Sequence, residues 1–397
     1  MERQEQQEQL EYQESEQTPE PKRKRRWRRP GKIGSILLII LAVLLAVTLI
    51  ANRDRLTIGH LSRAIQYSRL GGPSLAEEFR FASLGSNTFD LLGDGLAVAS
   101  GGGLRVYDRA ANLVYAEAFT MDRPMIQTSG NYVLTYDLGG TEIQTGNRRE
   151  ALAQPDWDRP IDRLIDARIN QNGWFVASAE QIGTRGAATV FRPDGTPYFR
   201  VPSGTGYLIA AELAADNQTL VLLSVTDAGG RAFWYEVGTA GDPLREYLGE
   251  GELFFDFWFT AANGAIGLIS SNTVQFISPD GALQSEYRFP DRHLRAYDVS
   301  EGNTVLYLAP SPTGPGGELV ILEPNGRVQY IEITGNLLDV SLNGRYTAAL
   351  FFDELLIFRG TSRYARFSQT EGMQHVLMRQ DGTVFRLSSH RAWLLVP

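Results

Sequence analysis

The chain has 397 residues, of which 43% are hydrophobic and 21% are charged, so it can build a large core and is not disordered throughout. It contains no cysteine, which excludes disulfides, thiolate zinc sites, cysteine nucleophiles and iron–sulfur clusters. Its 40 glycines and 18 prolines favour many turns over long helices.

Charge is unevenly distributed along the sequence. Residues 1–32 carry nine basic and seven acidic side chains, whereas residues 52–397 carry 29 basic and 39 acidic ones, a net charge of −10. Phosphate binding requires a basic surface, so the acidic body of the chain argues against nucleic acid as a partner.

A membrane-spanning helix is predicted over residues 33–51. These 19 residues carry no charge, and 13 of them are Leu, Ile or Val. At the helical rise they span about 28 Å, close to the thickness of the hydrocarbon core of a bilayer. Insertion is favoured by about 4–8 kcal/mol. We therefore expect a single-pass protein whose residues 33–51 contact the lipid bilayer.

The flanking charges predict the orientation of this helix. Residues 22–29 supply seven basic side chains and Lys32 an eighth, against four in residues 52–70. This bias places the N-terminus in the cytoplasm and the C-terminal domain outside the cell membrane. Residues 1–32 are then a disordered cytoplasmic tail, and residues 52–73 a juxtamembrane helix or linker. Cleavage as a signal peptide is the alternative, but the apolar run is longer than such peptides use.

From residue 74 the pattern changes to short apolar strands separated by turns of Gly, Asn and Asp. One turn recurs about every 41 residues, and a second, offset series of turns follows the same period. The first series consists of Asp94-Gly95, Gly130-Asn131, Asn172-Gly173, Asp216-Asn217, Asn263-Gly264, Gly302-Asn303, Asn343-Gly344 and Asp381-Gly382. Two tight turns per 40 residues predict four antiparallel strands per unit, the size of a propeller blade.

The ends of the repeat predict how the ring closes. The last unit offers only three strands, the third at Ala392–Val396, while an unpaired strand at Glu78–Ser83 precedes the first unit. Joining them hides two sheet edges, so we expect an all-β, eight-bladed β-propeller over residues 74–397 with a three-plus-one closure. Seven blades is the alternative, because the unit from Met125 to Gln154 has the weakest pattern.

With these repeats, the chain resembles bacterial β-propellers of the broad quinoprotein-like and WD40-like class. It is most similar to an uncharacterised family of single-pass bacterial membrane proteins that display an exported propeller. The resemblance covers residues 33–397 and implies a binding or sensing role in the cell envelope. It implies no established site residues.

The sequence offers no motif for catalysis, a metal or a cofactor. The four histidines, His60, His293, His375 and His390, lack the spacing of metal ligands. No nucleophile elbow, phosphate-binding loop or EF-hand pattern occurs. We therefore assign no catalytic, cofactor-binding or metal-binding residue.

One recurring feature is an acid on the first strand of several units. The six acids are Asp90, Asp166, Glu212, Asp256, Asp298 and Asp339. First strands line the central channel of a propeller, so these acids would form a ring able to bind a cation or a basic peptide. The alternative, which we favour, is that each carboxylate accepts backbone N–H groups or pairs with an arginine from a neighbouring blade.

Aromatic clusters and longer connections are the remaining candidates for recognition. Residues 233–235 and 254–259 are rich in aromatic side chains, which fill the space between blades or form a stacking platform. Connections at 179–185, 227–231 and 310–317 are expected to decorate one face.

These patterns favour a membrane-anchored, exported propeller that acts as a non-enzymatic binding or scaffold module for an envelope protein, peptide or glycan. Two alternatives stay open. One is an exported hydrolase or lyase that uses the channel carboxylates. The other is the ectodomain of a membrane signalling complex.

Overall fold

The computed structural model describes residues 74–81, 86–261 and 264–397. In this part of the chain, all regular elements are β-strands, and no helix is long and apolar enough to cross a bilayer. The predicted tail, membrane-spanning helix and juxtamembrane segment (residues 1–32, 33–51 and 52–73) lie outside the described residues.

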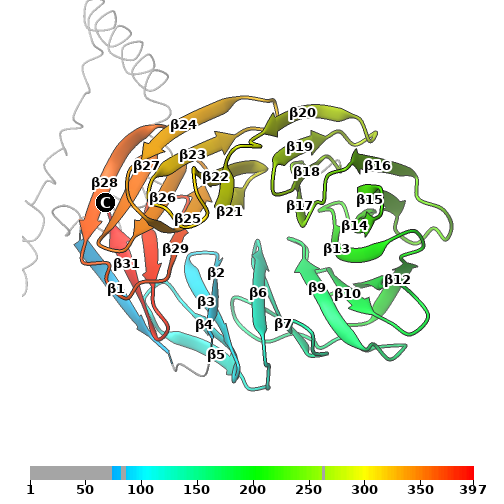
Figure 1. The fold of residues 1–397 in the computed structure, drawn as a ribbon. Helices are drawn as coiled ribbons and strands as arrows, with labels where there is room; N and C mark the ends of the chain where they lie inside the picture. Colours follow the sequence, from blue (N-terminus) through cyan, green and yellow to red (C-terminus); the bar gives the residue numbers. More distant parts are fainter. Residues whose placement is uncertain (1–73, 82–85, 262–263) are drawn as a thin grey trace, which may run out of the picture. The chain divides into compact units, whose positions relative to one another are not determined.

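The strands form eight antiparallel sheets arranged as the blades of a propeller (Figure 1). We number the blades by the chain order of their inner strands. Blade 1 comprises β2 (Thr88–Leu92), β3 (Gly95–Ser100), β4 (Gly103–Tyr107) and β5 (Leu113–Glu117). Blade 2 comprises β6 (Pro124–Ser129), β7 (Tyr132–Asp137) and β8 (Ile143–Asn147). Blade 3 comprises β9 (Arg163–Ile169), β10 (Phe175–Glu180), β11 (Ala187–Phe191) and β12 (Pro197–Pro202).

The next three blades have four strands each. Blade 4 comprises β13 (Tyr207–Leu213), β14 (Thr219–Thr226), β15 (Gly229–Glu236) and β16 (Arg245–Glu250). Blade 5 comprises β17 (Asp256–Phe259), β18 (Ile266–Ile269), β19 (Thr273–Ile277) and β20 (Leu283–Arg288). Blade 6 comprises β21 (His293–Ser300), β22 (Asn303–Ala309), β23 (Gly317–Leu322) and β24 (Val328–Ile333).

The last two blades bring the chain back to its first strand. Blade 7 comprises β25 (Leu337–Asn343), β26 (Tyr346–Phe351), β27 (Glu354–Arg359) and β28 (Ser362–Ser368). Blade 8 comprises β29 (His375–Met378), β30 (Val384–Leu387), β31 (Arg391–Val396) and β1 (Ser74–Arg80). Eight blades, rather than the alternative of seven, are therefore confirmed.

Closure of the ring follows the predicted three-plus-one scheme, with one correction to the strand bounds. The first strand, β1, pairs antiparallel with β31 from Ser74↔Val396 to Arg80↔Arg391. It therefore lies earlier than the predicted range of Glu78–Ser83. The reason is that β31 begins at Arg391, so the strand pairing ends at Arg80; one hydrogen bond of 3.2 Å follows, from the N–H of Phe81 to the carbonyl of His390. Phe79 is fully buried at this junction and contacts Phe385 edge-to-face at 5.1 Å between ring centroids.

Blade 2 departs from the predicted four strands. After β8 the chain turns back and makes a single bridge between Gly146 and Ala151, and the N–H of Leu152 bonds the carbonyl of Thr145. Pro155 and Pro160 follow, and proline has no N–H to donate to a ladder. A fourth strand is therefore reduced to a short segment that covers the edge of β8.

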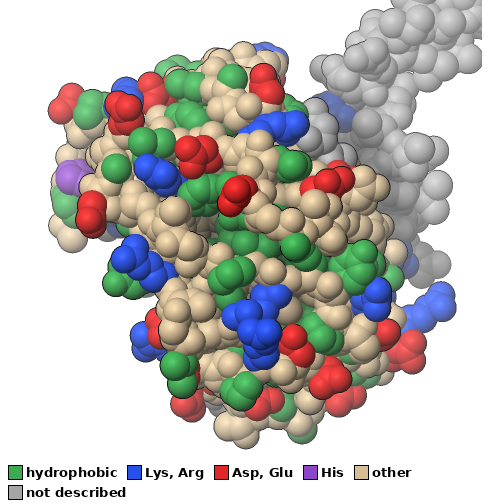
Figure 2. All heavy atoms as spheres, turned by 90° about the vertical axis from the view of Figure 1, so that its right-hand side faces the viewer, with side chains coloured by type: hydrophobic (Ala, Val, Ile, Leu, Met, Phe, Trp, Pro, Cys, Tyr) green, Lys and Arg blue, Asp and Glu red, His purple; other side chains and the backbone are tan. Residues whose placement is uncertain are grey.

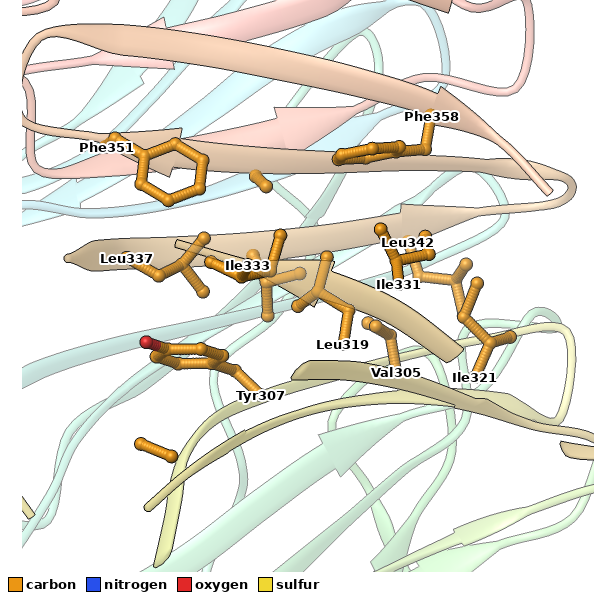
Figure 3. Packing of buried hydrophobic residues seen from close by; sticks show 13 residues of the cluster. Val305, Tyr307, Leu319, Ile321, Ile331, Ile333, Leu337, Leu342, Phe351 and Phe358 are labelled. Carbon is orange, nitrogen blue, oxygen red and sulfur yellow. The ribbon is translucent and has the colours of Figure 1, made fainter. Parts of the chain in front are cut away.

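Apolar side chains fill every boundary between neighbouring blades. The described residues contain eight buried hydrophobic clusters, and each joins two adjacent blades around the ring. Figure 3 shows the cluster between blades 6 and 7, where Val305 and Tyr307 face Leu337 and Phe351. Second strands such as β26 are buried along their whole length because blades cover both of their faces. This continuous core positions the inner strands around the axis.

Two kinds of connection share one face of the ring, because successive strands of a blade run in opposite directions. They are the connections between second and third strands and the connections from one blade to the next; we call this side the loop face. The longer connections predicted at 179–185 and 310–317 are present, with observed bounds of 181–186 and 310–316. The one predicted at 227–231 is only a two-residue turn, since β14 runs to Thr226 and β15 begins at Gly229.

Candidate functional site

The six predicted acids all lie on inner strands and are called here the axial carboxylates. They are Asp90 on β2, Asp166 on β9, Glu212 on β13, Asp256 on β17, Asp298 on β21 and Asp339 on β25. The inner strands of blades 2 and 8, β6 and β29, carry no acid. The structure divides the six into two groups with different partners.

The first group surrounds Arg168, a residue that the sequence analysis did not identify. Its guanidinium group donates from Nε to Asp166 at 2.8 Å, from Nη1 to Glu212 at 3.0 Å and from Nη2 to Asp256 at 2.5 Å. Nη1 also lies 2.5 Å from the carbonyl oxygen of Phe257, and the guanidinium carbon lies 4.8 Å from the Phe257 ring centroid. One side chain therefore joins blades 3, 4 and 5 at the axis.

Two tyrosines extend this cluster to the neighbouring blades. The hydroxyl of Tyr136 from blade 2 donates to Asp166 at 3.1 Å, and that of Tyr297 from blade 6 donates to Asp256 at 2.7 Å. Burial and the adjacent carboxylate raise the pKa of each phenol, which keeps both hydroxyls protonated as donors. The cluster thus spans five consecutive blades.

Electrostatics hold the cluster together although it is largely out of water. The Arg168 side chain is only 10% exposed, and the side chains of its three partners are 17–26% exposed. Burial alone would lower the pKa of the Arg168 guanidinium. The negative charges of Asp166, Asp256 and Glu212 outweigh this effect and hold that pKa well above its ordinary value. Burial raises the pKa of Glu212, against the opposing effect of Arg168. Three acids face one arginine, so the cluster retains negative charge when all are ionised.

The second group of axial carboxylates binds backbone N–H groups. An inner strand has no neighbour on its axial edge, so N–H groups there need another acceptor. Asp298 accepts from the N–H of Val299 at 2.8 Å in its own strand and from the N–H of Leu342 at 2.7 Å in blade 7. The hydroxyl of Ser341 donates to the same carboxylate at 2.9 Å.

Asp90 and Asp339 repeat this arrangement. Asp90 accepts from the N–H of Leu91 at 2.7 Å and from the N–H of Thr128 in blade 2 at 2.8 Å. Asp339 accepts from Val340 at 3.0 Å and from Val376 in blade 8 at 2.9 Å. Each carboxylate therefore ties its own inner strand to that of the next blade.

Gln127 makes the equivalent contact in blade 2, where the inner strand has no acid. Its side-chain oxygen accepts from the N–H of Ile169 in blade 3 at 3.2 Å. Sequence reasoning missed Gln127 because it searched for charge, whereas the position needs only an acceptor. Arg168 had a detectable signal, since it lies two residues after Asp166 and alternate residues share one face of a strand.

Burial shifts the acidity of two carboxylates in the second group. It raises the pKa of Asp90 to about 6 and that of Asp298 to about 7, against the hydrogen bonds that favour the ionised forms. Asp339 also lies 3.4 Å from Nδ1 of His375.

In the described part of the chain, no group of three His, Asp or Glu side chains is arranged to hold a metal ion. Binding of a cation or basic peptide by the axial carboxylates stays a prediction.

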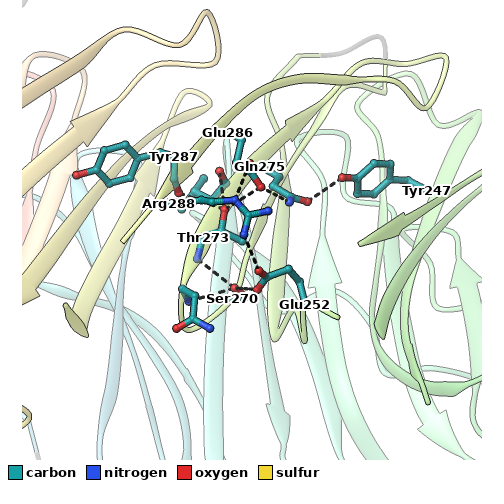
Figure 4. Close-up of polar contacts among 10 residues, drawn as sticks. Tyr247, Glu252, Ser270, Thr273, Gln275, Glu286, Tyr287 and Arg288 are labelled. Carbon is teal, nitrogen blue, oxygen red and sulfur yellow. Dashed lines mark hydrogen bonds and ion pairs between the residues drawn. The ribbon is translucent and has the colours of Figure 1, made fainter. Parts of the chain in front are cut away.

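A second polar cluster lies away from the axis, between blades 4 and 5 (Figure 4). Arg288 donates to Glu286 at 2.8 Å and lies 3.4 Å from a carboxylate oxygen of Glu252. Gln275 links Glu286, at 2.7 Å, to the hydroxyl of Tyr247, at 2.9 Å. The Arg288 side chain is 58% exposed, whereas the side chains of Glu252 and Glu286 are 13% and 24% exposed and Gln275 is buried. Only the arginine end of this cluster is therefore in water.

The aromatic clusters mostly fill the space between blades, the first of the two predicted alternatives. Trp234, Phe254 and Phe257 are buried in the cluster between blades 4 and 5, and the Trp234 indole N–H donates to Gly264 at 2.8 Å. Phe255 is the exception, with 45% of its surface exposed on the loop face.

Comparison with solved structures shows a similar fold in proteins of very different sequence. The C-terminal WD40 domain of Sif2 is 12% identical, with a TM-score of 0.58 over 82% of this chain and 98% of that chain. BamB from Moraxella catarrhalis is 13% identical, with a TM-score of 0.51 over 82% and 99%. A eukaryotic initiation factor is 10% identical, with a TM-score of 0.52 over 78% and 83%. These likenesses concern the fold alone.

Sequence comparison gives one family match. No curated protein matches the sequence significantly. Residues 74–242, which form β1 and the blades up to the start of β16, are similar to a protein family described as "Family of unknown function (DUF5711)". Residues 74–397 thus form an eight-bladed β-propeller of the class to which the WD40 and BamB structures belong.

Proposed function

We propose that this protein is a membrane-anchored, exported propeller that acts as a non-enzymatic binding or scaffold module for an envelope protein, peptide or glycan. The observation that carries the proposal is that the axial carboxylates already have partners within the propeller. All six accept hydrogen bonds or ion pairs from the propeller's own groups. A hydrolase needs two carboxyl groups free to meet a substrate, so these contacts favour binding over catalysis.

The loop face supports recognition. Four large apolar side chains on this face are strongly exposed: Ile182 (91%), Phe352 (64%) and Leu253 (60%) on connections, and Tyr207 (67%) at the first position of β13. Exposed apolar groups on loops held by a rigid scaffold are typical of binding surfaces. On the side shown in Figure 2, acidic and basic side chains are intermixed among apolar ones.

Membrane anchoring rests on residues 33–51 and on the basic residues before them. Reporter fusions to the full chain test it. Alkaline phosphatase fused to the C-terminus should be active outside the cytoplasm, and the same enzyme fused to the N-terminus should be inactive. The opposite result would contradict the predicted orientation.

Capture from envelope material tests the binding role. The full chain in detergent, cross-linked to membrane-envelope material, should retain a discrete protein or a glycan. Substitution of Tyr207 and Leu253 by serine should reduce retention if the loop face binds the partner. Arg327→Ser, at an exposed position in the turn between β23 and β24 on the opposite face, serves as the control. Turnover of a glycan library would instead support the hydrolase or lyase.

A further inference from the structure

A pocket of about 310 Å³ lies between blades 6 and 7 on the loop face. Its walls come from the end of β24, the connection 334–336 and the turn between β26 and β27. Ile333, Phe351 and Leu356 provide its apolar lining. Figure 3 shows Ile333 and Phe351 within the buried cluster that joins the two blades.

The walls of this pocket are fixed by packing and hydrogen bonds. The hydroxyl of Thr370 lies 3.1 Å from the carbonyl oxygen of Phe351 and 3.0 Å from that of Phe352, which holds the turn. Gly335 passes so close that a Cβ there would lie 2.9 Å from the Phe351 ring. The pocket is therefore preformed, with a volume in the range typical of ligand sites.

Phe352 and a set of acids stand around this apolar lining. The Phe352 side chain is 64% exposed although its neighbour Phe351 is buried. Glu332, Asp353 and Glu354 also line the pocket, and no lysine, arginine or histidine does. Among the described residues, only Glu354 of these three acids has an ion-pair partner, Arg366 at 2.6 Å. The pocket thus combines an aromatic ring with uncompensated negative charge.

We propose that this pocket binds a lysine or arginine side chain presented by an extended segment of a partner protein. The cation would lie against the face of Phe352 and pair with Glu332 and Asp353. Its aliphatic stem would cover Ile333 and Leu356. This inference rests on the proposed binding function and assigns to it one site and one class of partner.

Labelled heptapeptides that differ at one position test the proposal. Fluorescein-labelled Gly-Ser-Leu-Xaa-Leu-Ser-Gly, with Arg, Lys, Gln or Glu as Xaa, is titrated with the full chain in detergent and followed by fluorescence anisotropy. We expect the Arg and Lys peptides to bind at least tenfold more tightly than the Gln peptide. The double variant Glu332→Gln/Asp353→Asn should abolish this preference, and Phe352→Ala should weaken binding of the Arg peptide several-fold.

The control variant removes two acids elsewhere on the loop face, Asp227→Asn/Asp291→Asn, and so changes net charge equally. It should bind the Arg peptide as the unmodified protein does. Equal binding of the Arg and Gln peptides, or an equal loss in the control variant, would overturn the proposal. If the pocket variant still retains the envelope partner while the peptides do not discriminate, the pocket assignment fails and the binding function stands.

Discussion

Two arginines each hold several carboxylates: Arg168 joins blades 3, 4 and 5 at the axis, and Arg288 lies on β20, the outer strand of blade 5. Arg168 binds three acids and is 10% exposed, whereas Arg288 binds two acids and is 58% exposed. In water, an ion pair contributes little because the Coulomb attraction is weak and side-chain entropy is lost. Out of water, removing one partner leaves the others charged and unsolvated.

Burial of the arginine, rather than the number of ion pairs, decides which cluster the fold depends on. The axial cluster joins five blades and is shielded by them. The outer cluster of Figure 4 adds contacts to a boundary that Trp234 and Phe257 already fill. We therefore expect substitutions at the two arginines to differ several-fold in their effect on stability.

Arg168→Met should have the largest effect. It leaves three carboxylates facing each other at the axis and should lower the free energy of unfolding by about 3–5 kcal/mol. Urea unfolding of the full chain in detergent, followed by tryptophan fluorescence, measures it. Combining it with Asp166→Asn, Glu212→Gln and Asp256→Asn should recover part of the loss, and a loss below about 1 kcal/mol in the single variant would contradict the account.

Asp298→Ala should have an intermediate effect. It leaves the N–H groups of Val299 and Leu342 and the hydroxyl of Ser341 without their acceptor, which costs about 1–3 kcal/mol. The same unfolding experiment measures it, with the exposed Asp291→Ala as the control within about 0.5 kcal/mol of the unmodified protein. Equal losses in the two variants would show that the axial contacts contribute nothing.

The pH dependence of stability tests the burial of Asp298. The folded-state pKa of Asp298, about 7, exceeds the ordinary value of 3.8, so the folded protein binds this proton more tightly than the unfolded chain. Protonation of Asp298 contributes its full amount to the free energy of unfolding below pH 4, and this contribution is lost as the pH rises through 7. Relative to Asp298→Asn, the unmodified protein should therefore lose stability between pH 4 and pH 7, by up to about 1.4 kcal/mol per pH unit. A constant difference between the two proteins over this range would contradict the assignment.

Arg288→Met should have the smallest effect. Its guanidinium group is 58% exposed, so water solvates and screens its pairs with Glu286 and Glu252, and we expect a loss of at most about 1 kcal/mol. High salt should shrink this loss further, because exposed pairs are screened. A loss as large as that of Arg168→Met would overturn the comparison.

Much of the fold was predictable because turn chemistry is local. Gly195, Gly281 and Gly326 occupy the same outer turn of blades 3, 5 and 6, with φ of 83°, 84° and 85°. Glycine tolerates this left-handed region best, so Gly-containing turns mark the hairpins in the sequence. Counting them led to eight blades and to the closure by β1.

The site was predictable only in part. The first-strand position of the six acids follows from the period, but their partners do not. Arg168 contacts Glu212 and Asp256, which lie 44 and 88 residues away, and only the curvature of the closed ring brings these side chains together. The missing strand of blade 2 likewise depends on how residues 148–162 cover the edge of β8.

Amide hydrogen exchange tests the central claim, that Asp90, Asp298 and Asp339 each tie their own inner strand to that of the next blade. The N–H groups of Thr128, Leu342 and Val376 should be strongly protected in the unmodified protein. In Asp298→Ala, protection of Leu342 should fall at least tenfold more than that of Val376, whose acceptor is Asp339. Exchange of Leu342 at the rate of an open loop in the unmodified protein, or equal changes at both amides, would contradict the claim.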